Sequence, residues 1–485
     1  MKCQLYQIPW VQIGGVMLEF IVRFYGSTPK YVQLYDYIKS EIINGNIKSG
    51  SKLPSSRMLA THLSVSRNTI ISAYDLLSSE GYMESKSKRG YFISNDIDMD
   101  YITRPIKHNK RYNAELPSEI KKNYKVDFKY GQIDSKNFPY TQWRRALTCG
   151  FNSENIDSLS YGDKQGELSL RTIIADYIHK ARGVICSPDQ IVLTSGTQMS
   201  LDYICRLINH QYQSIAVEEP GYVVARTIFE LNKFKVQPIE LNDDGMDIND
   251  LQEKKSRVAL VAPSHQFPFG MTMPVSKRIE LLKWAEEKGG IIIENDYEGE
   301  FSHSGKPITC LQSFDNRGCV IYLYTFSGSL LPAARMSLFV LPRPLLEDYK
   351  QLLGSLEQTV PVYQQKALES FIAEGEWEKH IRRMKKLYKA KFIVLKEAIN
   401  ESMGKCVKII GNEIGLHVLL NINNGMDEKT LIEKAEDVGV KVYSTSKFWF
   451  DGQNQKSELI LLGYGNISKE EIVEGIKLLK KAWFN

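Results

Sequence analysis

The stretch Ile321–Pro342, IYLYTFSGSLLPAARMSLFVLP, decides the fold of the larger part of this chain. An apolar run, IYLY, leads into a loop of small and polar residues, and a second apolar run, MSLFVLP, follows Arg335. Short continuous apolar runs rich in β-branched and aromatic residues predict strands that are buried on both faces of a sheet. A loop at the end of such a strand is where open α/β sheets bind ligands.

Segments on either side of this stretch alternate between strand-like and helix-like patterns. Such alternation predicts an α/β domain with a largely parallel sheet covered on both faces. The predicted strands are Gln190–Leu193, Ser214–Val217, Val258–Ala262, Gly290–Glu294 and Val320–Tyr324, and the predicted helices are Gln198–Asn209, a helix after Tyr222, and Val275–Lys288.

The motif HIRRMKKLY, His380–Tyr388, resembles the entry to a small C-terminal α+β domain, and this resemblance implies such a domain from about residue 380 to residue 485. A long helix, Gly375–Ile399, leads into it, and Gly415–Leu420 and Lys441–Phe450 have the pattern of its strands. We expect His417 to be a packed side chain of this domain rather than a catalytic one.

The N-terminal part of the chain has a different pattern. Apolar residues at helical spacing predict three helices, the first around Leu34–Ile42, the second after Pro54, and the third from the N-cap residue Ser66 to Gly81. Two short strands follow, joined by the basic tip Ser85–Arg89. Three helices and a basic hairpin predict a winged helix-turn-helix.

The excess positive charge lies in the same region. Residues 1–94 hold 11 Lys and Arg against 6 Asp and Glu, whereas the rest of the chain holds 51 of each sign. A basic winged helix predicts binding to double-stranded DNA with the start of its third helix in the major groove. A protein-docking module is the alternative. The predicted DNA contacts are Arg67, Asn68 and Thr69 on that helix, and Arg57, Lys86, Lys88, Arg89 and Gly90 before it and on the wing.

Two sets of motifs resemble known families. G-x-K-L-P-S-S-R-x-L-A, V-S-R-N-T and E-G-Y, within residues 50–82, are similar to the GntR class of winged helices. Residues 126–485 resemble the aminotransferase-like domain of the MocR/GabR-type regulators, a fold-type I domain of the kind that uses pyridoxal phosphate (PLP). Residues 95–125, with both charges and two prolines, are the expected linker. The resemblance begins only at Met17, so about 16 residues before it are expected to be extra.

The resemblance implies a phosphate-binding end of a cofactor pocket. Tyr161 matches a tyrosine that reaches the phosphate site of a neighbouring subunit. Ser195 and Thr197, in a turn that opens a helix, match the residues that cradle the phosphate. Ser327 and Arg335 match the phosphate-binding serine and arginine of the loop quoted above.

The resemblance also implies a ring-binding end. Tyr222 matches the aromatic residue that stacks on the cofactor ring. His265 or Gln266 is expected to face the phenolic oxygen, and the sequence leaves both open. Asp296 matches the carboxylate that pairs with the pyridine nitrogen, with Tyr297 beside it.

Three departures from the family pattern remove the chemistry. The family's Schiff-base lysine is replaced by Gly328, and no lysine lies between Lys306 and Lys350. Two arginines that bind the substrate carboxylate are replaced by Val224 and Asn466. A PLP enzyme needs the lysine amine both to hold the cofactor and to move protons. An engineered lysine substitution would explain only the glycine, so we favour a naturally non-catalytic domain.

The resulting prediction is a DNA-binding transcriptional regulator whose aminotransferase-like domain senses a small-molecule effector without catalysis. Its pocket is expected to hold PLP or a related vitamer non-covalently, another anionic molecule, or nothing. An active PLP-dependent aminotransferase with a DNA-binding arm is the rival hypothesis.

Further expectations concern assembly, location and metals. Fold-type I domains share their sites across an interface, so we expect a homodimer. No run of about 18 uncharged apolar residues exists, and we expect a cytoplasmic protein without membrane contact. The cysteines are scattered without a C-x-x-C pair, so we expect no metal site.

Overall fold

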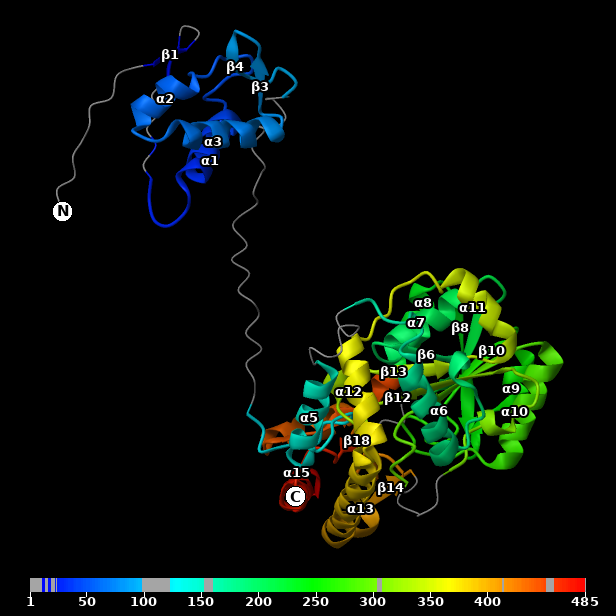
Figure 1. The fold of residues 1–485 in the computed structure, drawn as a ribbon. Coiled ribbons are helices and arrows are strands. Elements are labelled where there is room, and N and C mark those ends of the chain that lie inside the picture. Colours follow the sequence, from blue (N-terminus) through cyan, green and yellow to red (C-terminus); the bar gives the residue numbers. More distant parts are fainter. Residues whose placement is uncertain are drawn as a thin grey trace. The chain divides into compact units, whose positions relative to one another are not determined.

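The computed structural model describes residues 11–13, 16–18, 22, 24–97, 123–151, 160–302, 308–411, 414–450 and 458–484. The chain divides into two compact units, Met1–Lys121 and Lys122–Asn485 (Figure 1). Residues 98–122, which make up most of the expected linker, lie outside the described residues. In the part of the chain that the structure describes, no helix combines the length and apolarity needed to cross a membrane.

The N-terminal unit is a winged helix, as predicted. An antiparallel pair, β3 and β4, forms the wing after three helices, and a second short pair, β1 and β2, precedes them. The elements are β1 (Val11–Ile13), β2 (Val16–Leu18), α1 (Lys30–Ile43), α2 (Ser56–Leu63), α3 (Arg67–Ser79), β3 (Met83–Lys86) and β4 (Gly90–Ile93).

Local sequence explains the turn between α2 and α3. Ser64 ends α2 in the left-handed conformation, with φ of 51°, and this reverses the chain. The Ser66 hydroxyl then accepts a hydrogen bond from the backbone N–H of Thr69 at 3.1 Å and caps α3. Leu34, Ile38 and Ile70 are fully buried in the core that the three helices and the wing share. The predicted cap and apolar faces are therefore confirmed.

The C-terminal unit is built on an eight-stranded sheet of order β6-β13-β12-β11-β10-β7-β8-β9. The pairs β12-β11, β11-β10, β10-β7 and β7-β8 are parallel, and the other pairs are antiparallel. The strands are β6 (Ile191–Thr194), β7 (Ser214–Glu219), β8 (Lys235–Asn242), β9 (Gly245–Met246), β10 (Val258–Val261), β11 (Ile291–Asp296), β12 (Val320–Thr325) and β13 (Ser337–Val340).

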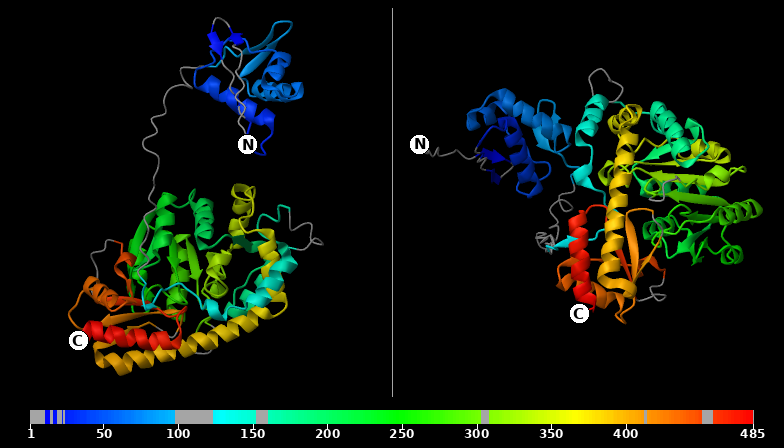
Figure 2. Two further views of the ribbon diagram at one scale, coloured as in Figure 1. Left: turned by 90° about the vertical axis from the view of Figure 1, so that its left-hand side faces the viewer. Right: turned by 90° about the horizontal axis from the view of Figure 1, so that it is seen from below.

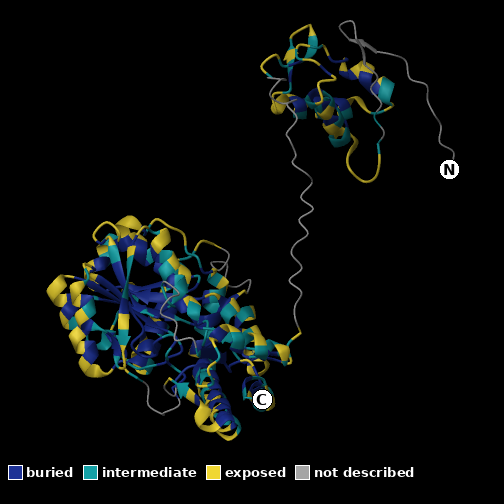
Figure 3. Cartoon of the chain, turned by 180° about the vertical axis from the view of Figure 1, so that it is seen from behind, coloured by how far each residue is buried: buried dark blue, intermediate teal, exposed yellow. Residues whose placement is uncertain are grey.

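Helices cover both faces of this sheet, and the central strands are buried (Figure 3). This arrangement confirms the predicted fold-type I α/β architecture. The helices are α5 (Tyr140–Gly150), α6 (Leu168–Arg182), α7 (Thr197–Ile208), α8 (Val223–Leu231), α9 (Ile248–Glu253), α10 (Val275–Lys288), α11 (Leu346–Leu352) and α12 (Val362–Ala373).

A smaller layer follows at the C-terminus. An antiparallel sheet of order β14-β15-β18-β17 packs against helices, and α13 and α15 lie side by side (Figure 2). Its core also includes Val126 and Phe128, from the start of the unit. The elements are β5 (Val126–Asp127), α13 (Glu376–Met403), β14 (Val407–Ile410), β15 (His417–Ile422), α14 (Glu428–Asp437), β16 (Val440–Lys441), β17 (Tyr443–Ser444), β18 (Leu459–Gly463) and α15 (Lys469–Phe484).

The predicted strand pattern at Lys441–Phe450 is confirmed only at its start. Only two-residue strands form there, followed by a 3-10 turn over Ser446–Phe448. The carboxylate of Glu428 causes the difference, because it accepts hydrogen bonds from the backbone N–H of Ser446 at 3.2 Å and from the backbone N–H of Thr445. A side chain thus satisfies the backbone donors that a longer strand would have paired with a neighbour.

Candidate nucleic-acid interface and ligand pocket

The start of α3 presents the side chains predicted to read DNA. Arg67 and Asn68 are exposed and Thr69 is half-buried. Arg57, in the first turn of α2, is exposed as well. The Arg67 guanidinium donates to the Ser56 hydroxyl at 3.4 Å, a long hydrogen bond that links the two helices.

The wing presents a second basic group. Lys88 adopts a left-handed conformation (φ of 60°) and Gly90 a φ of 100°, which together form the tight turn between β3 and β4. Lys88 and Arg89 are exposed at this turn. Lys86 is less available than these two residues, because its ammonium group pairs with Glu84 at 3.0 Å and lies over the Phe92 ring. Lys88 and Arg89 are therefore the wing cations best placed for phosphates.

The C-terminal unit contains a cavity of about 330 Å³ at the carboxyl ends of its parallel strands. Glu218 and Glu219 border it at the end of β7, Asn295 at the end of β11 and Thr325 at the end of β12. This is the edge where parallel α/β sheets place their ligands. Of the residues predicted from the sequence, the cavity wall includes Thr197, Tyr222, Tyr297, Ser327, Gly328 and Arg335.

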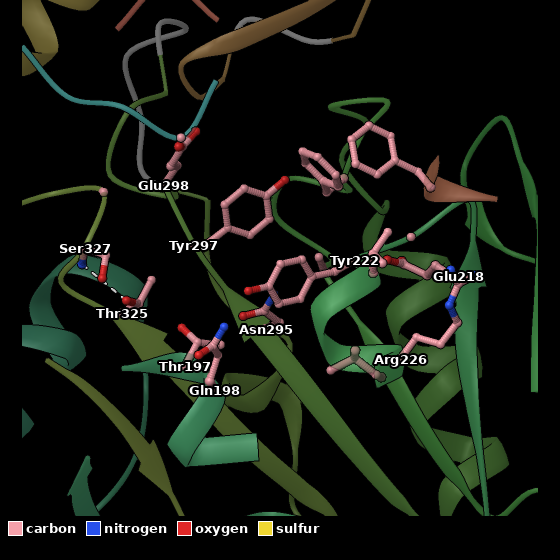
Figure 4. A pocket seen from close by; sticks show the side chains of 18 of the residues that line it. Thr197, Gln198, Glu218, Tyr222, Arg226, Asn295, Tyr297, Glu298, Thr325 and Ser327 are labelled. Atoms are coloured by element: carbon pink, nitrogen blue, oxygen red, sulfur yellow. Dashed lines mark hydrogen bonds between the residues drawn. The ribbon is translucent and has the colours of Figure 1, made fainter. Parts of the chain in front are cut away.

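One end of the cavity is suited to a phosphate group. Thr197 is the first residue of α7, so the free backbone N–H groups of that helix start open here. Arg335 lies against Gly196, where an added Cβ would come within 2.5 Å of the Arg335 Nη2 atom. Only a glycine at position 196 leaves room for this approach, which places the Arg335 guanidinium beside the helix start. Ser327 also lines this end (Figure 4).

Aromatic rings form the middle of the cavity. Tyr222, Tyr297 and Phe267 line it, and Figure 4 shows the Tyr222 and Tyr297 rings with Asn295 around the same space. Burial raises the pKa of Tyr222 and raises that of Tyr297 further, so both phenols are protonated at neutral pH. The buried Tyr297 hydroxyl has no hydrogen-bond partner among the described residues, and it is available to a ligand.

Asp296 does not line this cavity, so its predicted place needs correction. Successive side chains of a strand point to opposite faces, and at the end of β11 Asn295 faces the cavity while Asp296 faces away. The Asp296 carboxylate accepts hydrogen bonds from Arg182 at 2.7 and 3.1 Å and from the Tyr322 hydroxyl at 2.6 Å. It is therefore a buried ion-pair partner, and the residue that faces a ligand ring is a neutral amide.

Four other residues that were candidates from the sequence also lie outside the cavity wall. His265 is buried, with its ring centroid 5.1 Å from that of His417. The Gln266 side-chain amide donates to the Pro220 carbonyl at 2.9 Å and accepts from the backbone N–H of Phe269 at 3.1 Å, and Phe267 takes the place expected for His265 or Gln266. Ser195 is held by its backbone N–H, which donates to the Thr359 hydroxyl at 2.9 Å. Tyr161 is 89% exposed, so its proposed role at a neighbouring subunit stays a prediction.

The Glu298 side chain lies close to Gly328, the position at which the resemblance implies a lysine. A Cβ added to Gly328 would lie 3.2 Å from the Glu298 Cγ atom, which is tighter than ordinary van der Waals contact. Glu298 adopts a left-handed backbone conformation (φ of 57°) and lines the cavity beside the glycine. No lysine belongs to the cavity wall as far as the structure describes it. Val224 and Asn466 do not line it either.

The charges of the cavity are two arginines and buried carboxyl groups. Arg226 stands on the opposite side from Ser327 (Figure 4), where its guanidinium donates to the Trp449 carbonyl at 3.3 Å. Burial raises the pKa of Glu218 to about 8 and that of Glu298 to about 7. Burial lowers the pKa of His417 to about 4, so its ring is neutral at neutral pH. The cavity therefore offers an anion two fixed cations.

Sequence reasoning missed many residues of the cavity wall, among them Glu218, Arg226, Phe267, Asn295 and Glu298. Asn295 and Phe267 lie directly beside predicted residues, and the strict alternation of β11 could have identified the first. Glu218, Arg226 and Glu298 carried no signal, because only the folded chain shows which charged side chains turn inward.

The fold and the cavity define a winged-helix protein joined to a fold-type I aminotransferase domain, and comparison with known families agrees. Residues 30–93 match the bacterial regulatory proteins of the gntR family, and residues 124–453 match aminotransferase class I and II. The chain belongs to the transcriptional regulators that combine these two domains, the MocR type, and it is a DNA-binding regulator of that class.

Named relatives cover nearly the whole chain. The uncharacterized HTH-type transcriptional regulator YdeL of Bacillus subtilis is 40% identical over 94% of this chain and 97% of its own length. The probable rhizopine catabolism regulatory protein MocR of Rhizobium meliloti is 30% identical over 94% of each chain. The pyridoxine biosynthesis transcriptional regulator PdxR of Corynebacterium glutamicum is 26% identical over 91% of this chain and 93% of its own.

Solved structures confirm the fold of the C-terminal unit. The kynurenine aminotransferase of Pyrococcus horikoshii, a complex with PMP, matches with a TM-score of 0.65 and 28% identity, over 74% of this chain and 90% of that one.

Proposed function

We propose that this protein regulates transcription by coupling DNA binding in residues 1–94 to ligand binding in residues 126–485. The ligand is a phosphorylated aromatic molecule of the pyridoxal type, which the protein holds without a covalent bond and leaves unchanged. The regulator acts as a homodimer in the cytoplasm.

One observation carries this proposal. The cavity has the residues that suit a phosphate group, and it has a glycine where the resemblance implies a reactive lysine. Thr197, Ser327 and Arg335 line a helix start, where a phosphate dianion is stabilised by backbone N–H groups and a guanidinium. Directly beside Ser327, Gly328 has no amine, and Glu298 crowds the space into which a lysine would extend. A ligand can bind here through its phosphate, and the cavity supplies no lysine to hold it covalently.

The ring environment also favours binding over turnover. Pyridoxal chemistry relies on a protonated ring nitrogen, which an aspartate partner stabilises. Here the side chain at the end of β11 that faces the cavity is Asn295, whose amide carries no charge. The described residues therefore fit a phosphate and an aromatic ring, and they do not fit a catalytic, covalently bound cofactor.

The relatives support the ligand class. The Pyrococcus horikoshii aminotransferase with the same fold is a complex with PMP, and PdxR is named as a regulator of pyridoxine biosynthesis. Exposed apolar side chains support the homodimer. Phe151, Tyr161 and Leu168 are 64%, 89% and 59% exposed, and a second subunit would cover such apolar side chains.

Titration of the full-length protein with PLP tests the ligand. We expect saturable binding, with no protein adduct retained after borohydride reduction and denaturation. Arg335→Gln removes a charge-assisted contact and should weaken binding by about 10- to 150-fold, the equivalent of roughly 1.5 to 3 kcal/mol. The control Arg343→Gln, at an exposed arginine outside the cavity, should bind normally. A borohydride-stable adduct on a lysine would refute the proposal and support an active aminotransferase.

DNA binding is tested separately, by footprinting on the DNA that flanks the protein's own gene. Arg67→Ala should weaken specific binding by about 1 to 3 kcal/mol, whereas Lys30→Ala, which removes an equal charge from the start of α1, should weaken it less. PLP should change the DNA affinity of the wild type and not that of Arg335→Gln. Specific DNA binding that PLP leaves unchanged would overturn the coupling without affecting the DNA-binding assignment.

A further inference from the structure

Three buried side chains with metal-binding atoms meet at the edge of the cavity. His265, Glu298 and His417 are at most 9% exposed, and a ligand atom from each lies within 4.8 Å of the other two. They come from three separate parts of the chain: the loop after β10, the loop after β11 and the start of β15. The fold, rather than a local turn, brings them together.

The atoms converge on one small volume. A Cβ added to Gly415 would lie 2.4 Å from the His265 Nε2 atom and 2.8 Å from the Glu298 Oε2 atom, so both atoms face the same point. Gly415 has a φ of 80°, and its lack of a side chain leaves this point open. His417 follows two residues later, with its ring beside that of His265.

Supporting contacts hold these side chains in position. The His417 Nε2 atom lies 3.2 Å from the Pro268 carbonyl oxygen. Donation to that carbonyl places the ring's lone pair on Nδ1, and metal-bound histidines commonly have such a backbone partner. The Glu298 Oε2 atom accepts from the backbone N–H of Leu416 at 3.0 Å. The Tyr297 ring, with its centroid 5.3 Å from that of His265, lies on one side of the cluster.

We propose that His265, Glu298 and His417 bind one divalent transition-metal ion, with Zn²⁺ as the best fit. Two imidazoles and one carboxylate are a ligand set that Zn²⁺ takes in three-ligand sites, and nitrogen donors disfavour Ca²⁺ and Mg²⁺. Tetrahedral Zn²⁺ sets its ligand atoms about 3.4 Å apart, so side-chain shifts of about 1 Å complete the site.

The remaining coordination position faces the cavity. Glu298 and His417 both line the cavity wall, whereas His265 lies behind them. The ion would stand in front of Gly415, and the other Glu298 oxygen, Oε1, would face Gly328, whose added Cβ would lie 3.8 Å from it. A bound metal would add positive charge at the end of the cavity away from Arg226. The alternative for these three residues is a purely hydrogen-bonded cluster that binds no metal.

Metal titration of the full-length protein tests this site. After dialysis against a chelator, the wild type should bind one equivalent of Zn²⁺ per chain by calorimetry. One equivalent of Co²⁺ should produce visible d–d absorption without a thiolate charge-transfer band, which excludes the free cysteines. Glu298→Gln and His265→Gln should each lose stoichiometric binding.

A matched control separates the site from other histidines. His380 is also buried, with its Nε2 atom 3.0 Å from the Ser329 carbonyl oxygen, and His380→Gln should retain one equivalent. Calorimetric unfolding of the C-terminal unit serves as a check that each variant is folded. If a variant fails to fold, the Co²⁺ spectrum of the wild type alone decides whether the site binds a metal. No metal binding by the wild type, or one equivalent that survives in both Glu298→Gln and His265→Gln, would overturn the proposal.

Discussion

Replacement of Asp296 by asparagine should destabilise the C-terminal unit and leave its ligand site intact. Two hydrogen bonds join this carboxylate to Arg182, at 2.7 and 3.1 Å, and both side chains are 1% exposed. The Tyr322 hydroxyl donates a third hydrogen bond to the Asp296 carboxylate, at 2.6 Å. Asparagine has nearly the same shape and carries no charge, so the change leaves the Arg182 guanidinium buried without its counter-ion.

The expected cost follows from that burial. Removal of one partner of a buried ion pair typically costs 3 to 5 kcal/mol. Unfolding entropy is about 2.1 cal/mol/K per residue, so a unit of about 360 residues has roughly 0.76 kcal/mol/K. The cost therefore corresponds to a decrease in Tm of about 4 to 7 °C. The pair Arg182→Met with Asp296→Leu removes both charges and should recover part of the loss.

Scanning calorimetry measures the Tm, and PLP titration of the same samples measures the ligand affinity. Asp296→Asn should keep the wild-type affinity within about threefold, a difference below 0.7 kcal/mol. Asn295→Asp should instead raise the affinity about tenfold, because it places a carboxylate towards the ligand ring. If Asp296→Asn left the Tm within about 1 °C and abolished ligand binding, Asp296 would be a cavity residue and the assignment of Asn295 would be wrong.

Two further predictions concern the cavity. Gly328→Ala should lower the free energy of unfolding, measured by urea denaturation, by about 1 to 3 kcal/mol, because the new Cβ would lie 3.2 Å from the Glu298 Cγ atom. The same change in a Glu298→Ala background should lower it clearly less. Equal losses in the two backgrounds would exclude the contact. Burial holds the pKa of Glu218 at about 8, so between about pH 4.5 and 8 the folded state keeps a proton that the unfolded chain has lost, and stability falls as the pH rises. The free energy of unfolding should therefore fall by about 2 kcal/mol less between pH 6 and 8 in Glu218→Gln than in the wild type. An unchanged pH profile would show that Glu218 is ionised in the folded protein.

Local signals account for what the sequence predicted well. The winged helix follows from apolar spacing, the Ser66 cap and a basic hairpin, and each depends on residues close together in the chain. The main strands and helices of the larger unit were placed within a few residues of their observed bounds; helix Val275–Lys288, for example, matches α10. Continuous apolar strands between amphipathic helices leave few alternatives to a parallel sheet.

The sequence failed where side-chain direction or a distant partner decided the outcome. Adjacent residues of β11 face opposite ways, and the motif did not show that Asn295 rather than Asp296 faces the cavity. The last predicted strand ends early because the carboxylate of Glu428, a residue more than ten positions away, accepts hydrogen bonds from the backbone of that segment. Neither result can be read from local propensity.

By itself, the sequence determined the two-domain class, the winged helix and the absence of a lysine at position 328. These depend on residue identity and on periodicity along the chain. Only the tertiary structure decided that Glu298 fills the space beside that glycine, that Asp296 pairs with Arg182, and that His265 and His417 meet Glu298. Such contacts join residues 30 or more positions apart, and folding alone sets the distances on which their chemistry depends.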